Sequence, residues 1–243
     1  MTTAPPAPSA QKSALIEALL AFAAVSVLAS VLFHLKSIAF VAANLHALVA
    51  AGFLLTPQLL LRLRRVPDSE DYGFRARPVG QGLVLFAATC AAVLPVFTAG
   101  FWLWHRLLCA RWPLLVAGSC WRLLHPRLAL PPELPMLVLA QVLVVAVPEE
   151  LFFRGYLQTR LDEVWPRRWR ILGAELGWGW LVGAALFGLG HFLVTFEPQM
   201  LSRFFPGLLF GWMFARTRSV LAGALFHAVC NLLMDVLALS FLS

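Results

Sequence analysis

Charged residues are scarce in this chain. Only 13% of its 243 residues are Asp, Glu, Lys or Arg, whereas 60% are hydrophobic. A typical soluble domain carries about 25% charged residues, so this composition excludes an ordinary soluble globule. A membrane-spanning helix needs about 20 apolar residues, so the apolar runs, more than the chain length, determine the architecture. We expect one helical membrane domain.

Cysteine is also scarce, and its spacing carries no metal or redox motif. The four cysteines include no CxxC pair, and Cys90 and Cys230 lie within apolar runs. Neither a zinc ribbon nor a disulfide framework is indicated, and we expect the cysteines to be small packing residues. Internal repeats and interdomain linkers are absent as well.

The net charge of +7 does not indicate a nucleic acid partner. The arginines occur in short clusters between apolar runs. At such positions positive charge orients membrane helices and contacts anionic headgroups. The lipid bilayer is therefore the expected partner of these clusters, and no nucleic acid is expected.

The apolar runs predict an all-α, polytopic transmembrane helical bundle of about seven helices. Residues 1–13, rich in Pro, Ala and Ser, predict a disordered tail, and the apolar run that follows is too long for a cleaved signal peptide. Residues 112–124 form a shorter run broken by Pro113, Gly118 and Arg122, which favours an interfacial or re-entrant segment over an eighth span. The predicted spans are 14–35, 38–61, 81–105, 134–155, 171–196, 200–215 and 219–242.

The distribution of positive charge predicts the orientation. With seven spans, twelve Lys and Arg residues fall on one side of the membrane and six on the other. The positive-inside rule then places the N-terminus in the cytoplasm, although an eighth span would weaken the bias. High usage of Ala, Leu, Arg and Trp suggests a bacterial gene, so the bacterial cytoplasmic (inner) membrane is the expected location.

Ionisable residues inside three of the predicted spans require a partner or a function. Each costs about 2.5 to 3.5 kcal/mol to insert into the hydrocarbon core. Taken singly, each has a structural interpretation, such as an ion pair or an interhelical hydrogen bond. Their combination favours a functional site within the bundle. They are Glu149, Glu150 and Arg154 in the fourth span, His191 in the fifth, and His227 with the polar Asn231 in the last.

Helical spacing predicts different roles for these residues. Glu150 and Arg154 are four positions apart and can form an ion pair, whereas Glu149 is rotated by about 100° and presents its carboxylate elsewhere. Pro148 removes a backbone donor beside Glu149, and such a break is tolerated in a membrane where it faces protein or water. We therefore expect a water-filled cavity at Glu149.

The remaining polar residues complete a hydrolytic set. His227 and Asn231 share one helix face by their i, i+4 spacing, as do Phe187 and His191. A carboxylate beside a neutral imidazole can hold and deprotonate a water molecule. A second imidazole and an amide can donate hydrogen bonds to the oxyanion that forms when this water attacks a carbonyl group.

Three motifs on separate hydrophobic helices resemble the CPBP family of intramembrane proteases. They are EELFFR at 149–154, FGLGH at 187–191 and HAVCN at 227–231, which match the family patterns EExxxR, FxxxH and HxxxN. The family includes the type II CAAX prenyl proteases and the bacteriocin-processing and immunity proteins. The resemblance covers residues 134–243, the predicted catalytic helices, whereas residues 14–133 resemble only generic membrane helices.

The resemblance implies a glutamic intramembrane endopeptidase that cuts near the C-terminus or membrane anchor of a substrate protein. Glu149 with His191 would activate the water, and His227 with Asn231 would form the oxyanion site. Glu150 with Arg154 would hold the geometry or contact substrate, supported by Phe187. The expected substrate is a membrane-anchored protein or peptide, as in the myxosortase-like bacterial branch. The alternative within the family is a non-proteolytic immunity protein or peptide-binding scaffold.

Other chemistries fit the sequence less well. Two histidines and a glutamate can bind zinc, but the HExxH arrangement is absent and an Asn amide is a poor zinc ligand. We therefore expect no cofactor and favour a glutamate-activated water. A proton-coupled transporter would also use intramembrane Glu and His, but the two halves of the sequence contain no matching broken helices.

Overall fold

The structure is a computed structural model and describes residues 8–64, 72–73, 78–111 and 125–241. The predicted interfacial segment 112–124 lies outside these residues, as does the beginning of the predicted tail. Within them, six helices are long and apolar enough to cross a membrane. The chain is therefore an integral membrane protein, and the predicted polytopic helical bundle is confirmed. The six are α1 (Pro8–His34), α2 (Ala39–Leu63), α3 (Val79–Arg111), the continuous helical run Leu134–Val164, α8 (Trp178–Thr195) and α10 (Leu221–Phe241).

The run Leu134–Val164 changes helical type four times. It consists of α5 (Leu134–Ala140), the π-helix η2 (Gln141–Ala146), α6 (Val147–Glu150), the π-helix η3 (Leu151–Gln158) and α7 (Thr159–Val164). Pro148 lies in α6, between the two π-helical segments. A proline lacks the N–H that an α-helix requires, and a wider π-turn is one way to accommodate it. The break predicted at Pro148 is thus a change in winding, of a kind often found at functional sites.

Three predicted boundaries differ from the structure. α1 begins at Pro8, so residues 8–13 are helical rather than part of a disordered tail. The predicted span 200–215 is divided into the 3-10 helix η4 (Pro198–Arg203) and α9 (Phe204–Thr217). At 1.5 Å per residue α9 is about 21 Å long, shorter than the hydrocarbon core of about 30 Å.

The third difference is a β-hairpin at the start of the predicted span 171–196. Strands β1 (Trp169–Ile171) and β2 (Ala174–Leu176) pair antiparallel, and α8 begins only at Trp178. The turn consists of Leu172 and Gly173, with φ angles of 46° and 80°. This left-handed backbone reverses the chain and cannot continue into a helix.

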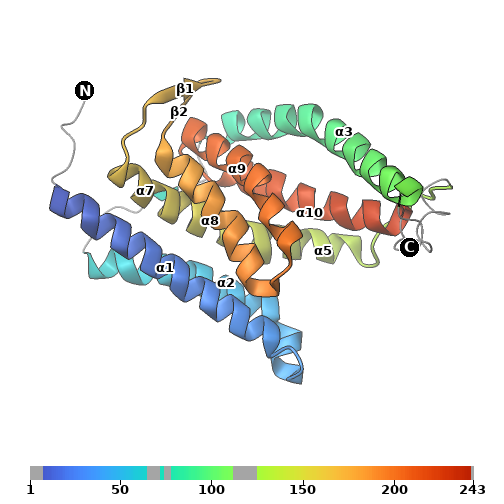
Figure 1. Ribbon diagram of the computed structural model, residues 1–243, viewed down its shortest axis with the longest axis horizontal. Helices are drawn as coiled ribbons and strands as arrows, with labels where there is room; N and C mark the ends of the chain where they lie inside the picture. The colour runs from blue at the N-terminus through green and yellow to red at the C-terminus, as the bar shows by residue number, and fades with distance from the viewer. Residues whose placement is uncertain (1–7, 65–71, 74–77, 112–124, 242–243) are drawn as a thin grey trace.

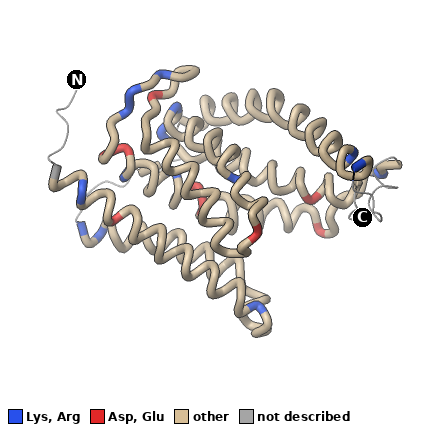
Figure 2. The backbone as a smooth tube through the Cα atoms, viewed as in Figure 1, with Lys and Arg blue, Asp and Glu red and all other residues tan. Residues whose placement is uncertain are grey.

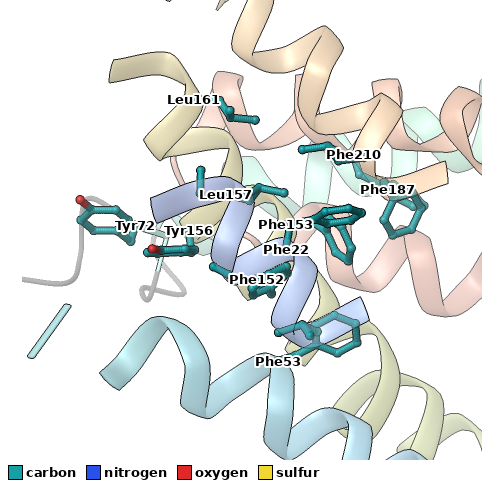
Figure 3. Packing of buried hydrophobic residues seen from close by; sticks show 14 of the residues in the cluster. Phe22, Phe53, Tyr72, Phe152, Phe153, Tyr156, Leu157, Leu161, Phe187 and Phe210 are labelled. Atoms are coloured by element: carbon teal, nitrogen blue, oxygen red, sulfur yellow. The ribbon is translucent and has the colours of Figure 1, made fainter. Parts of the chain in front are cut away.

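The helices form a bundle around η3. In Figure 1, α1 and α2 run together on one side, α3 and α10 run together on the other, and α8 lies between them. All eight residues of η3 are buried, and Figure 3 shows its aromatic side chains packed against those of the surrounding helices. This segment, which directly follows Glu149 and Glu150, is the centre of the core. The labelled aromatic residues of this core are Phe22, Phe53, Tyr72, Phe152, Phe153, Tyr156, Phe187 and Phe210.

The cysteines are not all simple packing residues. Cys109, in the last turn of α3, is disulfide-bonded, whereas Cys90 and Cys230 are free. The expectation for Cys109 was therefore wrong. Cysteine spacing alone does not reveal a pairing of this kind.

Candidate active site

Three helices bring Glu149, His191 and His227 to one point. Glu149 lies on α6, His191 on α8 and His227 on α10. The Oε2 atom of Glu149 is 3.8 Å from Nε2 of His191 and 3.9 Å from Nε2 of His227. These distances are too long for direct hydrogen bonds but are typical of groups bridged by a small molecule.

The hydrogen bonds of the two imidazoles define their orientation. Nδ1 of His191 lies 2.9 Å from the carbonyl oxygen of Phe187, and Nδ1 of His227 lies 3.0 Å from Oε1 of Glu150. Both partners are acceptors, so each Nδ1 carries the proton. When the rings are neutral, both therefore present an unprotonated Nε2 toward Glu149.

Glu149 has an unsatisfied oxygen in this pocket. Its Oε2 atom is buried and has no hydrogen-bond partner among the described residues. A buried carboxylate oxygen without a donor is energetically costly. One carboxylate oxygen and two imidazole nitrogens thus form a set of acceptors that favours a molecule with hydrogens to donate, such as water.

Glu150 connects α6 to α10. Its side chain is buried, and its Oε1 atom accepts from Nη1 of Arg154 at 2.9 Å and from Nδ1 of His227 at 3.0 Å. The spacing argument predicted the contact with Arg154 but not the one with His227. Gly223 allows α10 to pack closely here, since a Cβ atom at that position would lie 3.3 Å from Oε2 of Glu150.

Arg154 is enclosed by aromatic rings. Its guanidinium carbon is 4.1 Å from the ring centroid of Phe187 and 4.9 Å from that of Phe210, and Nη2 donates to the carbonyl of Gly207 at 3.4 Å. A planar guanidinium favours such stacked positions. Phe210 also stacks on the His227 ring, with centroids 4.9 Å apart and planes at 15°. The aromatic cage therefore fixes both the cation and the imidazole.

Asn231 lies in a different environment from the one predicted. Its amide donates to Oε1 of Gln141, on η2, at 2.9 Å. The amide is thus bonded to another side chain rather than directed at Glu149. Sequence reasoning missed Gln141. The signal was available, because Gln141 is an isolated polar residue in an apolar run, eight positions and about two turns before Glu149.

A cavity of about 210 Å³ lies beside Glu149 and His191. Its lining is predominantly apolar, with Ser26, His46 and Thr195 as further polar side chains. The expected cavity at Glu149 is therefore present, but its walls suit an apolar group better than a chain of water molecules. Half of the lining comes from α1 and α2: Val25, Ser26, Ala29, Phe33, Leu45, His46, Val49, Ala50 and Phe53.

The donor atoms around Glu149 can also be compared with a zinc site. Two imidazole nitrogens and a carboxylate are acceptable zinc ligands, and adjacent ligands of a tetrahedral zinc lie about 3.4 Å apart when the bonds are about 2.05 Å. The distances of 3.8 and 3.9 Å are wider than that. No group of three His, Cys, Asp or Glu residues in the described part of the chain meets the spacing of a metal site.

Comparisons with known proteins add one match. Residues 131–233 match the family model described as Type II CAAX prenyl endopeptidase Rce1-like. Searches of curated proteins and of solved structures gave no match. The matched segment contains the six candidate site residues Glu149, Glu150, Arg154, His191, His227 and Asn231, but it excludes α1 and α2, which supply half of the cavity wall.

Proposed function

We propose that the chain hydrolyses peptide bonds with a water molecule activated by Glu149, in keeping with the match of residues 131–233 to the model of Rce1-like type II CAAX prenyl endopeptidases. The observation that carries the proposal is the buried Oε2 of Glu149, which has no hydrogen-bond partner in the described part of the chain and lies within 4 Å of Nε2 of both His191 and His227. A water held there would lie against a base within reach of its protons.

In the proposed reaction, the water donates hydrogen bonds to Glu149 and to the unprotonated Nε2 of His191. Glu149 takes a proton as the water oxygen attacks the carbonyl carbon of the substrate. When the tetrahedral intermediate collapses, the C–N bond breaks and Glu149 returns the proton to the leaving nitrogen. The carboxylic acid formed in this way loses the second proton of the water, which the amine takes up, so the products are a carboxylate and a protonated amine and the enzyme is unchanged.

His227 is proposed to stabilise the oxyanion as an imidazolium ion. Glu150 accepts the Nδ1 proton, so a second proton on Nε2 would point into the site and could be donated to the substrate oxygen. With His227 protonated, the charges of Glu149, Glu150, Arg154 and His227 cancel, which suits a buried site. Asn231 can add a second donor only if its amide releases Gln141.

The apolar cavity supports a lipid-like or membrane-embedded substrate. It adjoins the proposed base, and its walls offer apolar contacts with few polar groups. A hydrophobic side chain, a prenyl group or part of a transmembrane anchor would bury its surface there. We propose that the substrate is a membrane-anchored protein cut near its C-terminus or anchor.

Cleavage of a panel of C-terminal transmembrane peptides, with and without prenylation, tests this function. The purified protein in detergent is compared with Glu149→Gln, His227→Ala and the exposed control Glu197→Gln, each with and without a chelator. Loss of cleavage in the first two variants alone, with no effect of chelator, supports the proposal. Chelator-induced loss that zinc reverses would identify a metalloprotease, and absence of wild-type cleavage across the panel would favour the non-proteolytic peptide-binding alternative.

We also propose that the end of the bundle containing the start of α1 faces the cytoplasm. Figure 2 shows many Lys and Arg residues at this end. The disulfide-bonded Cys109 lies at the far end of α3, and disulfides persist in oxidising compartments outside the cytoplasm. Single cysteines introduced at positions within 66–78 and 161–170 should resist an impermeant thiol reagent in intact cells, and labelling from outside would refute this orientation.

A further inference from the structure

The hairpin Trp169–Leu176 lies at the ends of two consecutive candidate spans. α7 ends at Val164, and α8 begins at Trp178. The connection between them therefore lies at one edge of the membrane, where Figure 1 shows the hairpin projecting beyond the helices. Tryptophan is enriched at this depth in membrane proteins, and Trp169 and Trp178 pack together here, with ring centroids 5.4 Å apart.

The turn of the hairpin exposes a leucine where turn chemistry disfavours it. Leu172 has a φ of 46° and is 76% exposed, and Gly173 follows with a φ of 80°. A turn with two left-handed residues favours Asn, Asp or Gly at its first position. A leucine in this conformation is strained, and its exposed side chain gains little from packing. The stability of the fold therefore does not explain why a leucine occupies position 172.

The tip is held in a fixed position against α9. Nε1 of Trp212 donates to the carbonyl of Ile171 at 3.0 Å, and Arg216 donates to the carbonyl of Leu172. Ile171, beside the tip, is 42% exposed. Two apolar side chains are thus presented outward by a backbone that is bonded to the bundle.

Exposed arginines surround this apolar tip. Arg167 pairs with Asp162 at 2.9 Å, but Arg168 and Arg170 make no ion pair with any described residue. Glu175 lies opposite Arg170 in the strand register without reaching it as an ion pair. Figure 2 shows blue basic segments along the hairpin, with an acidic segment on the neighbouring strand.

We propose that the hairpin binds the anionic lipids of the adjacent leaflet. Leu172 and Ile171 would enter the interface between headgroups, while Arg168 and Arg170 would donate to lipid phosphates, which guanidinium groups bind bidentately. The apolar tip favours a lipid surface over a soluble acidic partner, because that partner would leave Leu172 in water. The proposal does not depend on the peptidase function.

Hydrogen exchange of the hairpin amides tests the proposal. The full-length protein is placed in nanodiscs of phosphatidylcholine, with or without phosphatidylglycerol. Two arginines near an anionic surface contribute about 1 kcal/mol each, which corresponds to roughly 30-fold slower exchange. We expect this slowing in the wild type, its loss in Arg168→Gln/Arg170→Gln, and its retention in Arg106→Gln/Arg111→Gln at the other end of the bundle. Equal exchange of the wild type in both nanodiscs would overturn the proposal.

Leu172→Asn separates lipid insertion from folding. Asparagine suits the left-handed turn, so this variant should unfold at a higher temperature than the wild type in detergent. In nanodiscs, its hairpin amides should exchange faster than those of the wild type. Unchanged exchange in nanodiscs would refute insertion of Leu172. If the hairpin amides in phosphatidylcholine nanodiscs exchange slowly only after a soluble acidic peptide is added, the lipid assignment is overturned and the partner is a protein.

Discussion

Removing the Arg154 guanidinium should destabilise the whole bundle. Nη1 of Arg154 is 2.9 Å from Oε1 of Glu150, and the two side chains are only 3% and 1% exposed. Arg154→Met keeps an unbranched apolar chain between the aromatic rings but leaves the Glu150 carboxylate without its cation. The direct effect is therefore on a buried charge and much less on packing.

The magnitude follows from the geometry. Two unit charges 2.9 Å apart attract each other by about 6 kcal/mol at an effective dielectric constant of about 20. Part of this energy offsets the desolvation of both ions, and breaking a buried pair from one side costs roughly 3 to 5 kcal/mol. We expect Arg154→Met to lower the free energy of unfolding by that amount. His227 should also lose its fixed orientation, because its Nδ1 partner is the same Glu150 oxygen.

Unfolding of the purified protein in mixed micelles, followed by circular dichroism, measures this loss. The control is Arg106→Met, which removes an exposed guanidinium that lies over Trp102 at 4.9 Å and should change stability by less than about 0.5 kcal/mol. Arg154→Met combined with Glu150→Gln should cost less than the sum of the two single changes. A loss below about 1 kcal/mol in Arg154→Met, or strictly additive effects, would refute the buried-pair reasoning.

Three further predictions concern catalysis and stability. Glu149→Gln should reduce peptide cleavage about 10²- to 10⁴-fold with little change in stability, and a comparable loss of stability would instead indicate a structural carboxylate. Gln141→Leu leaves the Asn231 amide unpaired and should lower the free energy of unfolding by about 1 to 3 kcal/mol. If Gln141→Leu retains cleavage while Asn231→Leu loses about 10²-fold of it, the oxyanion role of Asn231 is supported. Gly155→Ala pushes a methyl group against the carbonyl oxygen of Tyr72 and should lower the unfolding temperature, whereas Gly100→Ala, which has no atom of a described residue within 4 Å of its new methyl group, should not.

Sequence reasoning identified the local parts of the site better than the contacts between helices. The predicted ion pair between Glu150 and Arg154 joins residues four positions apart, a spacing that helix geometry determines. The contact between Glu150 and His227 joins residues 77 positions apart. This contact depends on how α10 is rotated against α6, and the pattern of apolar residues does not determine that rotation.

The fold shows the same division. Bilayer thickness sets the length of an apolar run, so most of the membrane helices could be predicted from hydropathy. The hairpin could not, because Ile171 and Leu172 continue the apolar run of α8 and only the backbone at Leu172 and Gly173 separates them. The first turns of α1 were not predicted because residues 8–13 have a composition typical of disordered tails, although proline is common at the first position of a helix.

The shared cavity has an evolutionary consequence. The segment that matches the family supplies the proposed base and its histidines, whereas α1 and α2, outside that segment, supply half of the wall. Substitutions in the first two helices can therefore change what fits beside Glu149 while the hydrolytic residues stay the same. Relatives that share the three motifs but differ in these helices should have diverged in substrate specificity and kept the same reaction chemistry.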